Sequence, residues 1–159
     1  MRYSFRSATK NDYDEILNLK IQVHKFHVIN RPDFFSNSEL IFKKESFYKM
    51  LEDANWGIFV IEDDNHIYGY AIIKILKIEN NPIINHQLRI FIDDLCIDEA
   101  HRKKGIGSIL MKELESICKA KGYRYLELNV WDFNTNAIDF YKKHGMKTIV
   151  HRMEKIIDE

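Results

Sequence analysis

The sequence predicts a mixed α/β domain, in which helices cover the faces of a sheet, and three observations lead to this prediction. The 159 residues include 45% apolar and 13% aromatic residues, enough for one core. Apolar, β-branched runs are interspersed with segments of helical period along the chain. A strand near residues 86–97 leads through a basic glycine loop into a helix and then another strand, as in a parallel crossover. We therefore expect residues 1–159 to form a single domain.

The N-terminal part is predicted to contain one short strand followed by two helices. Residues 2–5 alternate polar and aromatic side chains, and Thr9 with Asp12 resembles a capping box at the start of a helix. This helix should end before Pro32, because the residue that precedes a proline avoids helical geometry. A second helix is expected over residues 38–53.

The middle of the chain is predicted to form three strands. Trp56 to Ile61 and Ile67 to Ile78 are apolar runs separated by the polar residues 62–66, a pattern typical of an antiparallel hairpin. A turn at residues 80–82 should lead into the third strand.

The C-terminal part is predicted to alternate helix and strand. The helix after the glycine loop should end at Gly122, a C-cap signal. Residues 123–131 have the composition of a strand, and Asn134 should cap a further helix. A last strand is expected over residues 146–152.

Charge and cysteine content argue against several classes of partner. Lysine plus arginine and aspartate plus glutamate number 24 each, so the net charge gives no support to bulk binding of nucleic acid or anionic membrane. No apolar run approaches the ~20 residues of a membrane span, and the N-terminus lacks the apolar core of a signal peptide. Cys96 and Cys118 lie among apolar residues. This pattern predicts buried free thiols in a reducing compartment. We expect a cytoplasmic protein without nucleic-acid or membrane partners.

The loop between the third strand and its helix is the strongest local signal for a ligand. It is not a Walker A loop, and it lacks the third glycine of a dinucleotide turn. Its two glycines would let phosphate oxygens reach successive backbone N–H groups at the positive end of a helix. The alternative is a basic turn that only precedes an amphipathic helix. The loop consists of Arg102, Lys103, Lys104, Gly105, Ile106, Gly107 and Ser108.

Two motifs together resemble a known family. The pattern Arg-x-x-Gly-x-Gly after a strand Ile-Asp-Asp-Leu-Cys-Ile is similar to the acetyl-CoA motif of the GNAT superfamily of N-acetyltransferases. Residues 134–146 resemble its segment Asn-x-x-Ala-x-x-Phe-Tyr-x-x-x-Gly-Phe, with Met146 in place of the last phenylalanine. The resemblance implies the GNAT fold: a central mixed, mostly antiparallel sheet with helices on both faces and a V-shaped splay between its two parallel strands.

The resemblance also implies acetyl-CoA as cofactor and assigns residues to three parts of it. Backbone groups of the strand would pair with pantetheine, loop amides and basic side chains would hold the pyrophosphate, and two residues of the second motif would contact the cofactor arm and approach the nucleotide. In that order, these residues are Leu95, Cys96 and Ile97; Arg102, Lys103, Lys104, Gly105, Ile106, Gly107 and Ser108; and Asn134 and Lys143. The side chains of Cys96 and Ile106 can then be ordinary core.

Tyr141 is the expected acid of the reaction. By the resemblance it lies beside the thioester sulfur, where the leaving thiolate needs a proton. A phenol with a pKa of about 10 is a suitable donor near neutral pH. The alternative is a helix aromatic that packs on the sheet.

Asp93 is the expected group that assists deprotonation of the acceptor amine, directly or through water. It aligns with the glutamate that polyamine acetyltransferases of this superfamily carry on the same strand. Strand alternation should send Asp94 to the opposite face, so that only one of the two carboxylates faces the acceptor. The alternative is an acidic strand face that merely attracts a cationic amine.

The first helix and the connector after it are expected to form a lip over the acceptor. The residues that would shape substrate choice are His27, Arg31, Asp33, Phe34, Phe35 and Asp94. The alternative is a helix end packed on the sheet. His24 and His27 lie one helical turn apart, a weak metal pattern without further ligands, and we expect no metal site.

These expectations describe an acetyl-CoA-dependent N-acetyltransferase with a small-molecule amine as substrate, such as a polyamine or an amino-acid derivative. Two alternatives stay open. The acceptor could be a protein N-terminus or a lysine, or the chain could be a CoA-binding regulatory module that has lost turnover. A homodimer is an arrangement that the sequence leaves open.

Overall fold

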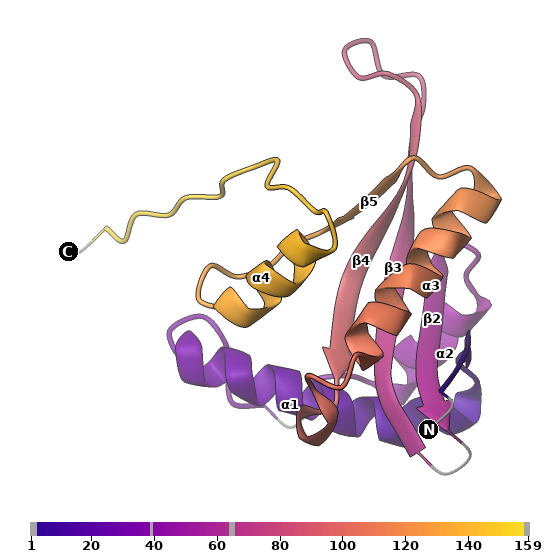
Figure 1. The fold of residues 1–159 in the computed structure, drawn as a ribbon. Coiled ribbons are helices and arrows are strands. Elements are labelled where there is room, and N and C mark those ends of the chain that lie inside the picture. Colours follow the sequence, from indigo (N-terminus) through magenta and orange to yellow (C-terminus); the bar gives the residue numbers. More distant parts are fainter. Residues whose placement is uncertain (1–2, 39, 64–65, 158–159) are drawn as a thin grey trace. The chain divides into compact units, whose positions relative to one another are not determined.

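In the described part of the chain, five strands form one sheet in the order β1-β2-β3-β4-β5 (Figure 1). Three neighbouring pairs are antiparallel, and β4 pairs with β5 in parallel. This is the mixed, mostly antiparallel sheet that the GNAT resemblance implies, and the predicted hairpin is its β2–β3 pair. The strands are β1 (Ser4–Ser7), β2 (Trp56–Asp63), β3 (His66–Ile78), β4 (Gln87–Ile97) and β5 (Tyr125–Leu128).

The computed structural model describes residues 3–38, 40–63 and 66–157. It divides the chain into two compact units, residues 1–129, which hold the sheet, and residues 130–159, which hold α4. The helices are η1 (Lys10–Asp12), α1 (Tyr13–Asn30), α2 (Lys44–Glu52), η2 (Glu99–His101), α3 (Ile106–Lys121) and α4 (Thr135–Lys143), of which η1 and η2 are 3-10 turns. No helix among the described residues is both long enough and apolar enough to cross a membrane.

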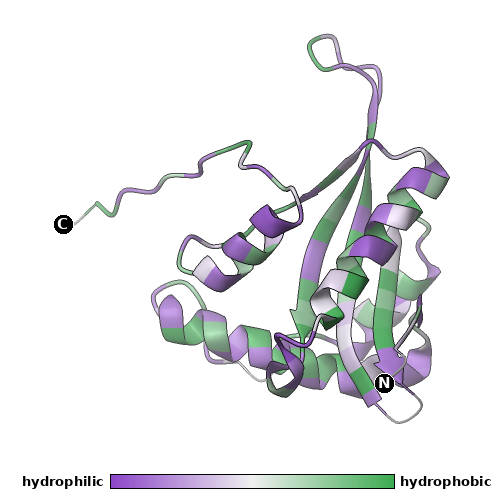
Figure 2. Cartoon of the chain, viewed as in Figure 1, coloured by the Kyte–Doolittle hydropathy of each residue, from purple (hydrophilic) through white to green (hydrophobic). Residues whose placement is uncertain are grey.

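Helices cover both faces of the sheet in the first unit. Side chains of α1 and α2 form the larger core with one face, and α3 packs Ile106 against Ile61 and Tyr68 on the other. Figure 2 shows apolar residues concentrated along the central strands, whereas α1 and α3 carry polar and apolar stripes. The larger core contains Tyr13, Ile16, Leu19, Phe47, Ile58, Val60, Ile67, Tyr70, Ile72 and Cys96.

Arg6 ties the first strand to its neighbours. Its guanidinium donates to Glu62 Oε2 at 2.6 Å and to Asp12 Oδ2 at 2.8 Å, and these two carboxylates hold the pKa of Arg6 above its ordinary value. Asp12 also accepts from the Thr9 backbone N–H at 2.6 Å, so the predicted capping box is present. This network fixes the start of α1 against β2.

One predicted helix start and one predicted strand are wrong. The second helix begins only at Lys44, and Ser38 Oγ accepts from the Leu40 N–H at 3.1 Å instead of capping this helix. The last strand, over residues 146–152, does not form in the described part of the chain. Ile149 and Val150 are exposed there, and a strand needs a neighbour for its backbone hydrogen bonds.

Other boundaries agree with the sequence or move by a few residues. Gly122 ends α3 as predicted, with a φ of 74° and its N–H on the Lys119 carbonyl. The predicted strand over 123–131 is the shorter β5. In the predicted turn at 62–66, Asp64 and Asn65 lie outside the described residues.

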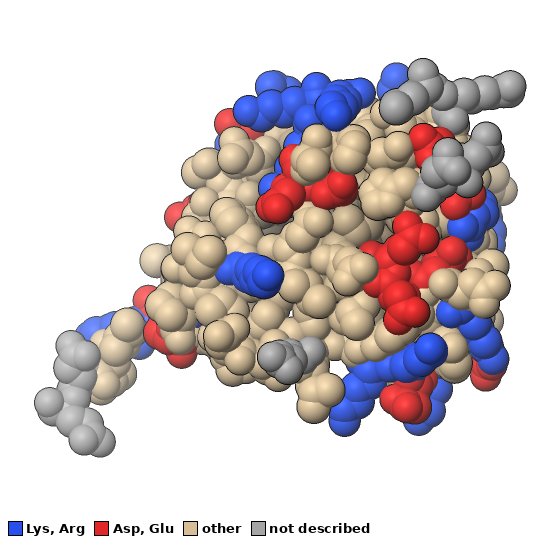
Figure 3. Space-filling view, turned by 90° about the horizontal axis from the view of Figure 1, so that it is seen from below, with Lys and Arg blue, Asp and Glu red and all other residues tan. Residues whose placement is uncertain are grey.

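The described surface carries both signs of charge. On the face in Figure 3, groups of lysine and arginine side chains lie beside groups of acidic ones. This mixture agrees with equal numbers of acidic and basic residues in the chain.

Candidate active site

A one-residue bulge in β4 determines where the two aspartates point. Ile92 pairs with Ile73 and Asp94 pairs with Ile72, so Asp93 is an extra residue opposite β3. An extra residue reverses the alternation of the side chains that follow it. The prediction that Asp93 and Asp94 face opposite sides is therefore wrong, and both line one cavity.

This cavity has a volume of about 240 Å³ and lies between α1 and the bulge. Its walls combine two carboxylates, one ammonium group, two imidazoles and two aliphatic side chains. The lining residues are Lys20, Val23, His24, His27, Ile41, Asp93 and Asp94. Of the residues predicted to shape the substrate site, only two line this cavity in the described part of the chain: His27 and Asp94.

Asp94 is held by two partners. Its Oδ2 accepts a hydrogen bond from the Tyr70 hydroxyl at 2.7 Å and forms an ion pair with Lys20. The Lys20 ammonium lies 4.7 Å from the centre of the Phe42 ring, which completes its surroundings. Burial, and then the charge of Asp94, raises the pKa of Tyr70 well above its ordinary value. Asp94 is thus a hydrogen-bond acceptor that contacts of β3 and α1 hold in place.

Asp93 is in a different situation, because solvent reaches it at the edge of the cavity. Its partial burial is the main reason that its pKa is raised, and the neighbouring charge of Asp94 acts in the same direction. Lys20 and Lys74 oppose this shift without cancelling it. A carboxylate with a raised pKa accepts a proton more readily than an ordinary one. Asp93 therefore has the properties of a proton acceptor at an accessible position.

The predicted lip residues after α1 pack on one another. The His27 ring stacks on Phe35 with centroids 4.9 Å apart, and the Arg31 guanidinium lies 5.7 Å from the Phe34 ring centre. Arg31 also forms an ion pair with Asp33 at 2.8 Å. Burial lowers the pKa of His27 and favours its neutral form. This cluster borders the cavity through His27, and its role in substrate choice stays a prediction.

A larger cavity of about 310 Å³ lies at the start of β4. Among the described residues, its walls contain none of the predicted catalytic or binding residues and no carboxylate. It is therefore a weaker candidate for an amine site than the smaller cavity. The larger one is lined by Asn85, His86, Gln87, Leu88, Gly122, Arg124 and Tyr125.

The glycine loop contains two residues in the left-handed region of the backbone. Lys103 and Gly105 both adopt positive φ, at 63° and 84°, and Gly105 is the N-cap of α3. A Cβ on Gly105 would meet no atom within 4 Å, so its conformation and not a lack of space calls for glycine. The first N–H groups of a helix point out of its positive end, and among them the Ser108 N–H already donates to the Gly105 carbonyl at 3.0 Å. Ile106 is buried in the core, as expected.

The predicted pantetheine pairing falls on the part of β4 that β5 does not accompany. In the described part of the chain, β5 pairs with no residue of β4 beyond Ile92. One group there is already used, because the Arg102 Nε donates to the Ile97 carbonyl at 3.0 Å. Burial raises the pKa of the Cys96 thiol to about 12, so this side chain is an inert part of the core.

The residues predicted on the second motif belong to the second compact unit. Asn134 Oδ1 accepts from the Ala137 N–H at 3.2 Å, which confirms the predicted helix cap. Tyr141 lies on α4, 5.3 Å from the Phe140 ring, and Lys143 is exposed in the last turn. The roles of Asn134, Tyr141 and Lys143 at the cofactor stay predictions.

Sequence reasoning missed the two partners of Asp94. Lys20 precedes His24 and His27 by one and two helical turns, so helical spacing could have placed all three on one face of α1. Tyr70 gave no signal, because an aromatic residue inside an apolar strand is typical of a core. Only the paired strands and α1 together bring these groups to Asp94.

Comparison with known proteins places the chain in a family. The family model described as "Acetyltransferase (GNAT) family" matches residues 23–146. A crystal structure of a tetramutant of the BH1408 protein from Bacillus halodurans is 32% identical, covers 97% of this chain and 99% of that chain, and superposes with a TM-score of 0.93. Glucosamine-6-phosphate N-acetyltransferase from Arabidopsis thaliana, 22% identical over 99% of this chain and all of that one, shares the fold with a TM-score of 0.69.

Curated relatives agree over shorter lengths. "Uncharacterized N-acetyltransferase MJ1207" of Methanocaldococcus jannaschii is 26% identical over 91% of this chain and 61% of its own. A Bacillus subtilis protein, provisionally named as a ribosomal protein bS18-alanine N-acetyltransferase, is 33% identical over 65% of this chain and 63% of its own. The chain thus spans about six-tenths of the length of these two relatives. Because the family model matches most of its residues, the chain belongs to the acetyltransferase (GNAT) family.

Proposed function

We propose that residues 1–159 act as one domain that transfers the acetyl group of acetyl-CoA to a small primary amine by direct attack. The observation that carries this proposal is the bulge in β4, which brings Asp93 and Asp94 to one cavity. A cationic amine would enter a site with two carboxylates, one of which Lys20 already neutralises. Asp93 is then the charge that remains for the substrate.

The two aspartates would divide the work. An alkylammonium has a pKa of about 10 and must lose a proton before it attacks. Asp93, with its raised pKa and its exposure, takes that proton directly or through a water molecule. Asp94, held by Lys20 and Tyr70, keeps the cavity wall in place. The amine nitrogen then bonds to the acetyl carbon, the carbon–sulfur bond breaks, and Tyr141 gives its proton to the thiolate.

Acetyl-CoA would lie along the segment that runs from β4 to α3. The backbone of Leu95, Cys96 and Ile97 pairs with pantetheine, and the amides of residues 103–108 hold the pyrophosphate. The positive φ of Lys103 and Gly105 supports this assignment, because left-handed residues in turns are common in backbone anion sites. Both cysteines of the chain are free thiols, and we place the reaction in the cytoplasm.

A small amine is favoured over a protein by the names of some relatives, and the size of the cavity is compatible with it. A volume of about 240 Å³ suits a small molecule or a single side chain. Thialysine N-epsilon-acetyltransferase of Bos taurus is 33% identical over 38% of this chain, and streptothricin acetyltransferase A of Bacillus subtilis is 28% identical over 69%. The rival acceptor is a protein N-terminus, which the provisional name of another relative supports.

The test is acceptor-dependent thiol release from acetyl-CoA. Polyamines, lysine analogues and peptides with free N-termini are compared at equal concentration, with acetyl-CoA binding measured on the same protein. Turnover with small amines supports the proposal. Turnover with peptides alone would overturn the acceptor class, and tight binding of acetyl-CoA with no turnover on any amine would favour a regulatory module.

A further inference from the structure

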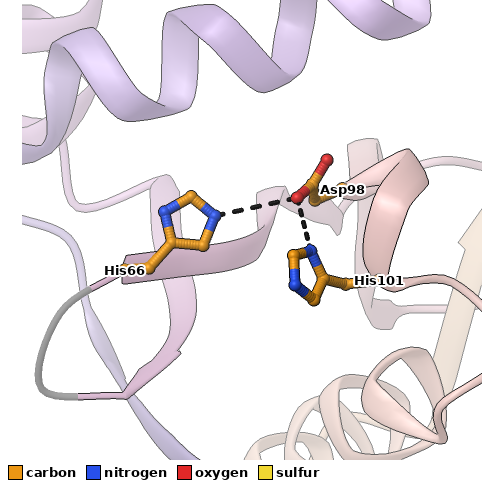
Figure 4. A group of neighbouring side chains, drawn as sticks. All are labelled: His66, Asp98 and His101. Carbon is orange, nitrogen blue, oxygen red and sulfur yellow. Dashed lines mark hydrogen bonds and ion pairs between the residues drawn. The ribbon is translucent and has the colours of Figure 1, made fainter.

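A second group of titratable side chains lies outside the acceptor cavity (Figure 4). It consists of His66 at the start of β3, of Asp98, which is the N-cap of η2, and of His101, which is the last residue of η2. One ligand atom from each residue lies within 4.8 Å of the others. Figure 4 shows both imidazole rings directed at the same carboxylate: His101 Nδ1 lies 2.6 Å and His66 Nε2 lies 3.7 Å from Asp98 Oδ2.

A second layer of contacts orients two of these three side chains. The other ring nitrogen of His66, Nδ1, lies 3.5 Å from Glu15 Oε2, and the Ile67 backbone N–H donates to the same oxygen at 3.0 Å. The second oxygen of Asp98, Oδ1, accepts from Gln22 Nε2 at 3.1 Å. A carboxylate behind the remote nitrogen of a histidine is the usual support of a metal-binding imidazole. The cluster therefore has both ligands and their supporting groups.

We propose that His66, Asp98 and His101 bind a zinc-type divalent cation, with solvent in the remaining coordination position. Two imidazoles and one carboxylate are a common ligand set of Zn²⁺. They suit Mg²⁺ and Ca²⁺ less well, because those cations prefer oxygen ligands alone. The cation takes the place of the proton between His101 and Asp98. Ligands at about 2.0–2.1 Å from a tetrahedral ion are roughly 3.3 Å apart. On binding, the distance between His101 and Asp98 would therefore increase slightly, and that between His66 and Asp98 would decrease.

The position of the cluster gives the cation a structural task. It links the start of β3 to the turn that directly precedes Arg102, the first residue of the glycine loop. Arg102 in turn donates to the Ile97 carbonyl at the end of β4. The cluster shares no residue with the cavity that contains Asp93 and Asp94. Bound metal should thus stabilise the fold around the loop without being a reactant.

The ordinary role of these residues sets the contrast for the test. Asp98 is also the N-cap of η2, where it accepts from the Ala100 N–H at 3.4 Å, so its replacement would disturb the turn itself. His66 is the better position to change, because its side chain is 45% exposed and it does not cap η2. His86 is a matched control: it is also exposed and lies 3.7 Å from one carboxylate, Glu79.

The experiment is calorimetric titration of Zn²⁺ into tag-free, chelator-treated protein, with Co²⁺ absorption as a second probe of the ligand set. We expect one Zn²⁺ per chain, at least a 10-fold loss of affinity in His66→Ala and in Glu15→Gln, and wild-type binding in His86→Ala. Zn²⁺ should raise the melting temperature of the wild type and of His86→Ala, but not of His66→Ala. Wild-type protein that binds no Zn²⁺, His66→Ala that binds as tightly as wild type, or Mg²⁺ that competes equally would overturn the proposal. The readout is independent of acetyl transfer.

Discussion

The glycine loop and the aspartate pair belong to the same strand–loop–helix segment, yet they are built in different ways. The loop presents backbone groups, whose direction follows from the positive φ of Lys103 and Gly105 and from the start of α3. The aspartate pair presents side chains, whose direction depends on the register of β4 against β3. A site made of backbone is thus specified locally, and a site made of side chains needs the surrounding fold. The two regions should respond differently to substitution.

The largest effect is expected from Asp93→Asn in the aspartate pair. If Asp93 is the proton acceptor, this change should lower kcat by about 10²–10⁴-fold. The substitution is nearly isosteric at an exposed position, so folding should be retained. Steady-state thiol release and thermal melting of the same preparation measure both. A variant with wild-type turnover would remove Asp93 from the reaction.

The same variant should change stability with a defined pH dependence. The folded pKa of Asp93 is raised by partial burial, so the folded state binds this proton more tightly than the unfolded state. The stability from the protonated group is complete below about pH 3.9, its unfolded pKa, and is lost as the pH rises through the folded value. As the pH rises from acid to neutral, the melting temperature of the wild type should therefore fall further and further below that of Asp93→Asn. A constant difference in melting temperature across that range would contradict the raised pKa.

Asp94→Asn should affect stability more than Asp93→Asn does. An amide keeps an acceptor for the Tyr70 hydroxyl but removes the charge that Lys20 pairs with. The loss should be about 1.5–3 kcal/mol in the free energy of unfolding. Urea denaturation measures this loss. Asp33→Asn is the control: Asp33 is the exposed partner in the ion pair with Arg31, so its replacement should lower the free energy of unfolding less. Equal losses in the two variants would mean that Asp94 is not held as the structure indicates.

Gly105→Ala tests the loop. There is space for a Cβ at this position, so the loss in the free energy of unfolding arises from the left-handed backbone and should be about 1–2 kcal/mol. We expect the affinity for acetyl-CoA to fall about 5–30-fold through the same cost, whereas Gly105→Asn should lose less because asparagine tolerates this conformation. Calorimetric binding of acetyl-CoA distinguishes them. Equal losses for alanine and asparagine would point to space and not to backbone conformation.

The smallest effect on turnover is expected from Cys96, which lies on the segment shared by both regions. Burial raises the pKa of this thiol to about 12, so almost no thiolate exists at neutral pH to attack a thioester. Cys96→Ala should keep the wild-type rate per folded molecule while losing some stability to the smaller side chain. Rapid alkylation of native Cys96 by iodoacetamide at pH 7, read by mass spectrometry, would contradict this assignment.

The same contrast explains what the sequence could predict. The loop, the cap at Gly122 and the cap at Asn134 are local signals, and all three elements form where predicted. The bulge at Asp93 gave no local signal, so simple alternation sent the two aspartates to opposite faces. Lys20 and Tyr70 reach Asp94 only through long-range packing. The expected strand over 146–152 had the right composition, but composition does not supply a neighbouring strand.

The pH profile of kcat/KM for a small amine tests the division between Asp93 and Asp94 most directly. If Asp93 accepts the proton, kcat/KM of the wild type falls at acid pH, and the apparent pKa of this acid limb lies above the ordinary pKa of an aspartate. This limb should disappear in Asp93→Asn and persist in Asp94→Asn. A limb that persists in Asp93→Asn and disappears in Asp94→Asn would contradict the account and make Asp94 the proton acceptor.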